Sequence, residues 1–301
     1  MHRAFAGWLT ERPWHAAVAV AFCGALSQLL LPLSVVACAI PVLCALRFNA
    51  TMGLITAAIG TGSASWLIFT LAPTVLPGTF TGVVVTFFGP LALALLLKRT
   101  GSLNLCFQVA VLAAGVLLGV VHVVLADPVA VWKAPLLEFL DVVQAPGLQT
   151  AAERDTFVAA VAPSMWGALG AMALAFVFGA LLLGRWWDSL LRTETGAFGG
   201  EYRLLRLGLA LGIAVSIVFV LALATDFPLI SALTWIAFVA LTFQGLAAAH
   251  RSRAGGRLSR GWLAAIYVLL IVPLSMMQTM FVLATWGFAD NWLRPRRPAS
   301  L

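Results

Sequence analysis

Polar side chains that could do chemistry are few in this sequence, and most lie within or beside long apolar runs. The candidates for contacting a small molecule are Gln28, Ser63, Trp66, His122, Gln244 and Gln278. Amides and hydroxyls can hydrogen-bond a polar ligand, and an indole ring can stack on a planar one. The same amides also hydrogen-bond between membrane helices, so the three glutamines predict either a polar cavity or contacts that join helices.

His122 lies well inside an apolar segment, where an ionisable side chain is costly. It is either a substrate contact that responds to pH, since histidine titrates near neutrality, or a neutral ring bonded to a neighbouring helix. Ser63, Ser65 and Trp66 follow Gly60 and Gly62 in another apolar segment. Glycine lets either a ligand or a second helix come close, so this segment predicts a ligand contact or tight helix packing.

Catalytic and cofactor chemistry have little support in the sequence. Residues 61 to 65 read TGSAS and lack the GK[ST] of a phosphate-binding loop. The four cysteines lie in apolar segments without a CxxC pair, which argues against a zinc site or a disulfide framework. No nucleophile and base stand close together in a motif, and the apolar segments lack the buried carboxylates of a proton pump. We therefore expect no enzyme activity, no cofactor and no metal.

The composition predicts the class of protein that must position these side chains. The chain is 62% apolar and 10% charged, whereas about a quarter of the residues of a soluble domain are charged. It is expected to be an all-α, polytopic transmembrane bundle forming a single integral membrane domain over residues 1–301. The net charge of +7 comes from basic residues in short loops, which indicates contact with a lipid bilayer rather than with nucleic acid.

Hydropathy predicts eight to nine membrane segments. They cover residues 15–31, 33–47, 52–72, 78–97, 103–125, 160–184, 204–225, 228–249 and 261–286. The first two are expected to form a short helical hairpin broken at Pro32, with Pro41 inside its second helix. Residues 126–156 are rich in acids and form the expected outer loop, in which PLLEFLDVV has the spacing of an amphipathic helix on the membrane surface.

The distribution of lysine and arginine predicts the topology. With the N-terminus in the cytoplasm, 13 of the 18 basic residues fall in inner segments, as the positive-inside rule favours. This assigns the protein to the cytoplasmic (inner) membrane and makes residues 185–206 a cytoplasmic loop. The arginine-rich tail after residue 293 falls outside after nine crossings, unless Pro273 breaks the last segment into a re-entrant pair.

The loop at residues 185–206 combines arginines with a tryptophan pair. Arg185, Trp186, Trp187 and Arg206 are either interface anchors or the docking surface for a cytoplasmic protein partner, because both residue types favour the headgroup level. Asp290 and Asn291 likewise either close a polar site or cap a helix end.

Residues 184–208 read GRWWDSLLRTETGAFGGEYRLLRLG, and this pattern resembles the YybS-like bacterial integral membrane proteins, an uncharacterised family. Residues 244–270 (QGLAAAHRSRAGGRLSRGWLAAIYVLL) and 287–297 (GFADNWLRPRR) are similar to the same family. More distantly, the proline-broken N-terminal hairpin is similar in layout to the substrate-capture subunits of energy-coupling vitamin transporters and to the rod-shape protein MreD.

The similarity to substrate-capture subunits implies that small residues on the first helix dock a membrane partner. Ala17, Ala21 and Ala25 stand at the four-residue spacing that this requires, although such spacing also serves ordinary helix packing. Two functions follow as hypotheses. The first is a partner-dependent transport component that binds a small molecule or lipid, and the second is a non-transporting scaffold in cell-envelope or cell-shape assembly.

Overall fold

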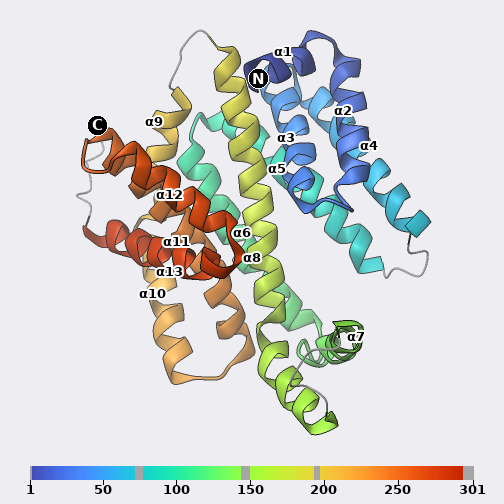
Figure 1. The fold of residues 1–301 in the computed structure, drawn as a ribbon, viewed down its shortest axis with the longest axis vertical. Helices are drawn as coiled ribbons and strands as arrows, with labels where there is room; N and C mark the ends of the chain where they lie inside the picture. Colours follow the sequence, from blue (N-terminus) through green and yellow to red (C-terminus); the bar gives the residue numbers. More distant parts are fainter. Residues whose placement is uncertain (1, 72–76, 144–149, 193–196, 294–301) are drawn as a thin grey trace. The chain divides into compact units, whose positions relative to one another are not determined.

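The computed structural model describes residues 2–71, 77–143, 150–192 and 197–293 (Figure 1). It is all-helical over these residues, without a strand, as the sequence predicted. The helices are α1 (His2–Glu11), α2 (Pro13–Leu26), α3 (Leu31–Arg47), α4 (Ala50–Leu71), α5 (Pro77–Thr100), α6 (Leu103–Val124), the 3-10 turn η1 (Ala130–Trp132), α7 (Lys133–Val143), α8 (Ala151–Leu191), α9 (Ala197–Arg203), α10 (Gly208–Ala224), α11 (Pro228–Ala254), α12 (Arg260–Ile271) and α13 (Pro273–Leu293).

The nine predicted apolar segments fall on helices, the last of them on two, but the count of eight to nine membrane segments is not confirmed. Five of the described helices are long and apolar enough to cross a membrane alone, namely α4, α5, α6, α8 and α11. A sixth results if α9 and α10 count as one broken span. A membrane span needs about 20 residues, and α2, α3 and α12 are shorter than this. The helices are consistent with a multi-pass protein in a lipid bilayer.

The N-terminal hairpin is formed by α2 and α3, which pack on each other and on α4. Proline lies in the first turn of both α2 and α3, where its missing N–H removes no helical hydrogen bond. Glycine lets α2 and α4 approach closely, since a Cβ on Gly24 would lie 3.0 Å from the carbonyl oxygen of Gly60 and 2.6 Å from Oγ of Ser63. At Gly60 the glycine thus serves tight helix packing, whereas a Cβ on Gly62 would meet no atom within 4 Å.

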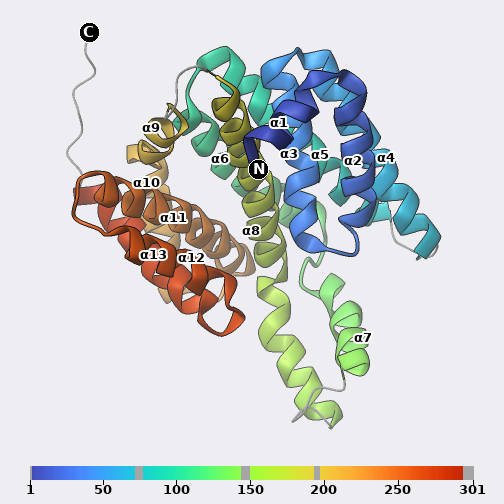
Figure 2. The same cartoon turned by 45° about the horizontal axis from the view of Figure 1, so that its top comes forward.

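The last apolar run is two helices instead of one span. Helix α12 ends before Pro273, and α13 begins at that proline and packs beside α12 (Figures 1 and 2). Proline cannot continue the hydrogen-bond ladder of α12, and Oγ of Ser275 donates to the carbonyl of Leu269 at the break. The predicted segment 261–286 is thus divided at Pro273, the break considered for a re-entrant pair.

The predicted outer loop contains η1 and α7, and its last residues begin α8, which is 41 residues long. The expected amphipathic helix exists, but its apolar side packs on protein. Leu136 and Leu140 of α7 contact Val158 and Ala162 of α8 in a small core. At a rise of about 1.5 Å per residue, α8 is roughly 60 Å long, so it exceeds the hydrocarbon core of about 30 Å.

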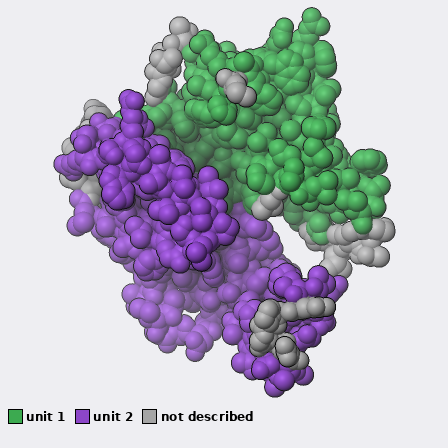
Figure 3. Space-filling view, in the orientation of Figure 1, with its two compact units in different colours: residues 1–110, 173–205 green, residues 111–172, 206–301 purple. Residues whose placement is uncertain are grey.

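The contacts divide the chain into two compact units, whereas the sequence predicted one domain (Figure 3). Unit 1 contains residues 1–110 and 173–205, and unit 2 contains residues 111–172 and 206–301. Helices α6 and α8 each contribute to both units.

Candidate functional site

The richest concentration of charged side chains in unit 1 lies at the C-terminal end of α8. The sequence predicted a loop over residues 185–206, but residues 185–191 are the last two turns of α8 and residues 197–203 form α9. Residues 193–196 lie outside the described part of the chain. A helix here places Arg185, Asp188 and Arg192 on one face, because side chains three and four residues apart are neighbours.

Asp188 is the centre of this cluster, and its side chain has no solvent exposure. Oδ2 accepts from Nη1 of Arg185 at 2.9 Å and from Nε of Arg192 at 2.9 Å. Nη1 of Arg47, at the end of α3, lies 3.9 Å from Oδ1, and that oxygen has no hydrogen-bond partner among the described residues. A second contact joins the same helices, since Nη2 of Arg47 donates to the carbonyl oxygen of Leu191 at 3.1 Å.

Arg185 connects α9 to this cluster. Its guanidinium donates from Nε to Oε2 of Glu201 at 3.0 Å and from Nη2 to Oε1 at 2.5 Å. Two parallel bonds of this kind fix the relative geometry of both side chains and are stronger than bonds between neutral groups. We call Arg47, Arg185, Asp188, Arg192 and Glu201 the Asp188 network.

The tryptophan pair holds α1 against α8. Trp186 contacts His2 with ring centroids 5.0 Å apart, and Trp187 meets Phe5 edge-on at 5.5 Å. Trp187 is buried and Trp186 is half-buried. Of the residues predicted to dock a partner, Arg185 and Trp187 are therefore packed inside unit 1, and their visible role is to join helices.

Besides Arg47 and Arg192, the accessible side chains near this network include those of α1 and of Arg12, which follows it. Arg3, Trp8 and Arg12 are exposed, while Ala6 and Leu9 on the other side of the helix are buried. An amphipathic helix with arginine and tryptophan on its outer side suits the headgroup region of a membrane or a protein surface there. Part of the exposed basic surface thus comes from the N-terminal helix and Arg12, which the sequence analysis did not single out.

Unit 2 contains a second polar cluster, around Gln244 of α11 and Asn291 of α13, both of which are buried. Gln244 accepts from the backbone N–H of Leu207 at 2.9 Å and donates to the carbonyl of Gly287 at 3.0 Å. Asn291 bonds both backbone groups of Gly208, accepting from its N–H at 3.2 Å and donating to its carbonyl at 3.0 Å.

These two amides supply hydrogen-bond partners to backbone groups at the start of α10. The first N–H groups of a helix have no partner within it, and amide side chains from α11 and α13 supply that partner here. Gly208 has φ +81°, a conformation that favours glycine. Gln244 is therefore a contact that joins helices, one of the two alternatives considered for the glutamines. Asn291 caps the start of α10, whereas Asp290 forms an ion pair with Arg251.

Arg206 belongs to the same cluster, since its Nη2 donates to the carbonyl oxygen of Asn291 at 2.6 Å. Arg251 at the end of α11 pairs with Asp290 near the end of α13. The start of α10 and the ends of α11 and α13 therefore meet at one end of unit 2.

The two ends of unit 2 differ in charge. Arg206 and Arg251 mark the end just described, and the turn from α11 to α12 adds further arginines. Helix α8 runs in the same direction as α11, because Gly167 faces Ala232 and Gly170 faces Ile236. The acidic start of α8 thus lies toward the N-terminal end of α11. Most acids of unit 2 are at this opposite end: Asp127, Glu138, Asp141, Glu153, Asp155 and Asp226.

The structure does not bring the other residues predicted to contact a substrate into one site. Gln28 is exposed and its side-chain amide donates to Oγ of Ser27. Ser63 donates to the carbonyl oxygen of Gly60, and His122 bonds through Nδ1 to the carbonyl oxygen of Leu118. Trp66 and Gln278 are exposed.

The small residues on α2 are partly accessible. Ala17, Ala21 and Ala25 are half-buried, and the closest approach of α2 to α4 occurs at Gly24 instead. Partner docking through this alanine face stays a prediction.

Two hydroxyls on α4, of which the sequence analysis considered only that of Ser65, are buried without a hydrogen-bond partner among the described residues. They are Oγ1 of Thr61 and Oγ of Ser65, one turn apart on α4. Their position inside TGSAS was visible in the sequence, but which hydroxyl of that segment faces the interior depends on how α4 packs.

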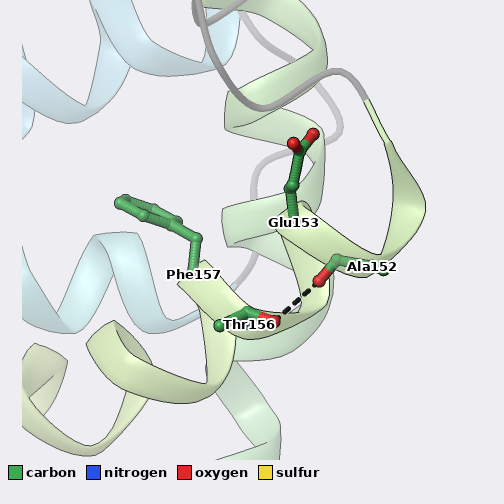
Figure 4. Close-up of a pocket in the computed structure, with 4 residues that line it drawn as sticks. All are labelled: Ala152, Glu153, Thr156 and Phe157. Carbon is green, nitrogen blue, oxygen red and sulfur yellow. Dashed lines mark hydrogen bonds between the residues drawn. The ribbon is translucent and has the colours of Figure 1, made fainter.

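A pocket of about 410 Å³ lies at the start of α8, and Ala152, Glu153, Thr156 and Phe157 line it (Figure 4). Its lining is mostly apolar, and Oγ1 of Thr156 donates to the carbonyl of Ala152 instead of pointing to a ligand. None of the residues predicted to contact a substrate lines this pocket. Within the described residues there is no group of three or more His, Cys, Asp or Glu side chains that could hold a metal ion.

No protein-family model matches the sequence, and neither the curated proteins nor the solved structures give a match. The resemblance to YybS-like membrane proteins accordingly stays a prediction.

Proposed function

We propose that this protein is a multi-pass inner-membrane scaffold, which presents a fixed basic surface to a protein partner on the cytoplasmic side. The observation that carries the proposal is the Asp188 network, which joins α3, α8 and α9 at the basic end of unit 1. The tryptophan pair adds α1 to the same assembly.

The energetics of the network favour a role in holding shape. Removing a carboxylate from water costs several kcal/mol unless the charge is paired and hydrogen-bonded. An arginine that only anchored a helix at the headgroups would keep its guanidinium in water, yet Arg185 has a side chain only 11% exposed. A surface that is already ordered loses less entropy when a partner binds, so the fixed position of α1 on α8 suits a docking surface.

The location of the charges supports the proposed orientation. In unit 1, Lys98 donates to the carbonyl oxygens of Ala45 and Phe48, which places the basic end of α5 beside the basic end of α3. Unit 2 also has one end rich in arginine and one rich in acids. The positive-inside rule assigns both basic ends, with the N-terminus, to the cytoplasm. The resemblances to YybS-like proteins and to MreD agree with an envelope role.

The experiment is quantitative affinity purification from native membranes after mild cross-linking, followed by mass spectrometry. It compares the wild-type protein, the surface variant Arg3→Gln/Arg12→Gln and the control variant Lys133→Gln at the acidic end. We expect a partner protein to co-purify with the wild-type protein in a constant ratio. The control should retain the same amount of this partner, and the surface variant should retain at least fivefold less. An identical set of proteins at identical ratios in all three samples would overturn it.

A partner-dependent substrate-capture component is the second candidate, and the buried hydroxyls of Thr61 and Ser65 favour it. Unpaired polar atoms on the inner side of a membrane helix could bond a polar group of a small molecule. Native mass spectrometry of the gently solubilised protein tests this idea. A retained small molecule that is lost from Thr61→Val/Ser65→Ala supports the candidate, whereas equal spectra of both proteins count against it.

A further inference from the structure

The turn between α11 and α12 has a defined backbone. The N–H of Gly256 donates to the carbonyl oxygen of Arg253 at 3.0 Å, and the N–H of Arg257 donates to that of Ser252 at 2.9 Å. Gly256 has φ +74°, the left-handed conformation that favours glycine at a helix end. Ser259 then caps α12, since Oγ accepts from the N–H of Trp262 at 3.3 Å. Side chains on this turn therefore occupy predictable places.

Three arginines on this turn are exposed: Arg253, Arg257 and Arg260. Within the part of the chain that the structure describes, their guanidinium groups have no hydrogen bond or ion pair. Asp290, the acid at this end of unit 2, pairs with Arg251. Three positive charges within eight residues thus remain to attract an anion, and guanidinium matches the geometry of phosphate oxygens.

An apolar strip begins where the arginines end. On α12, the residues Trp262, Tyr267, Val268, Leu269 and Ile271 are exposed. The helix has 12 residues and is roughly 18 Å long, about the thickness of one half of the hydrocarbon core. Trp262 lies at the arginine end of the strip, and tryptophan favours the level of the headgroups.

An anionic group beside an apolar chain of this length is the chemistry of an anionic phospholipid. We propose that the α11–α12 turn and α12 form a site for such a lipid, with the phosphate headgroup on Arg253, Arg257 and Arg260 and an acyl chain along α12. Free phosphate would bind the arginines without contacting the apolar strip, whereas a phospholipid would contact both. This difference distinguishes the two possible ligands. The inference does not depend on the scaffold function.

The test is native mass spectrometry of the detergent-solubilised protein titrated with phosphatidylglycerol and, separately, with zwitterionic phosphatidylcholine. The wild-type protein is expected to prefer phosphatidylglycerol. Because each arginine near a membrane surface contributes about fivefold in affinity, Arg253→Gln/Arg257→Gln/Arg260→Gln is expected to bind that lipid about 100-fold more weakly. The corresponding lysine triple variant keeps the charge and is expected to stay within about tenfold of the wild-type protein.

The matched control, Lys98→Gln/Arg99→Gln/Lys133→Gln, removes three exposed charges outside the α11–α12 turn. It is expected to lose less than about fivefold, since these residues lie outside the proposed site. Equal losses in both glutamine triples would show that binding depends on net charge alone and would overturn the site. If the triple variant does not fold, the three single glutamine variants serve, each with an expected loss of about fivefold.

A competition experiment distinguishes the lipid from free phosphate. A 100-fold excess of inorganic phosphate over bound phosphatidylglycerol is expected to leave the lipid in place, because phosphate makes no contact with α12. Displacement of the lipid by phosphate would identify a site for the free anion and would contradict the lipid assignment.

Discussion

Replacing Asp188 by asparagine tests whether the basic end of unit 1 depends on a buried charge. The substitution keeps the size of the side chain but removes its negative charge. Arg185 then keeps Glu201 as its anionic partner, while Arg192 and Arg47 lose theirs. An asparagine would also turn N–H groups toward guanidinium groups that can only donate. The expected result is a less stable protein in which α9 and the end of α3 are held less firmly to α8.

The magnitude follows from the exposure of each partner. Removing one member of a buried ion pair costs about 3–5 kcal/mol. The side chain of Arg192 is 51% exposed and that of Arg47 is 36% exposed, so water stabilises both once Asp188 is neutral. Arg185 is 11% exposed but keeps two hydrogen bonds to Glu201. We therefore expect a loss of about 2–3 kcal/mol in the free energy of unfolding, below the full cost of a broken buried pair.

The assay is equilibrium unfolding in mixed detergent micelles, monitored by tryptophan fluorescence and far-UV circular dichroism. Asp141→Asn is the control, because Asp141 is 63% exposed and also pairs with an arginine, Arg154. An exposed pair contributes at most about 1 kcal/mol, so the control is expected to lie within that range. If Asp188→Asn is no less stable than Asp141→Asn, the buried network does not hold the basic end together and the scaffold argument fails.

Four further substitutions, of which Gly62→Ala is a control, test the packing of the helices by the same unfolding assay. Gly245→Ala would place a Cβ 1.9 Å from the carbonyl oxygen of Leu283, so the free energy of unfolding is expected to fall by about 3 kcal/mol. In Gly62→Ala the new Cβ meets no atom within 4 Å, so the free energy of unfolding should change by less than about 1 kcal/mol. Thr61→Val removes a buried hydroxyl without a partner and should raise the free energy of unfolding by up to about 1 kcal/mol; a lower stability would reveal a hydrogen bond to that hydroxyl. Asn291→Ala removes both hydrogen bonds to the first residue of α10 and should lower the free energy of unfolding by about 2–3 kcal/mol. Amide hydrogen exchange at the start of α10 should become faster, and unchanged exchange there would contradict the capping role.

Much of the helical layout could be predicted because its causes are local. Apolar runs and prolines determine where a chain can be helical, and the predicted boundaries at residues 103–125 and 52–72 agree closely with α6 and α4. Prediction was weaker where a helix continues beyond its apolar part. Helix α8 extends at both ends past the predicted segment 160–184, since polar residues continue a helix once their side chains find partners. Hydropathy detects the apolar segment and not the helix around it.

The candidate site depended on pairings between distant residues. Arg185 and Asp188 stand together in the sequence, but nothing in their spacing predicts that Arg47 approaches from α3 or that Glu201 returns from α9. The sequence allowed Gln244 either to line a cavity or to join helices. The second alternative depends on hydrogen bonds from Gln244 to Leu207 and Gly287, which are distant in the sequence.

By itself, the sequence determined that the chain is helical, that several of its segments are apolar enough to cross a membrane and that its basic residues are concentrated in particular segments, because composition and hydropathy are properties of the chain alone. Only the tertiary structure decided which polar groups remain available. It placed Arg185, Trp187 and Gln244 inside the packing and left Arg253, Arg257 and Arg260 exposed. The physical reason is that a buried polar group must find a partner, and that partner is supplied by another helix whose approach no local pattern encodes.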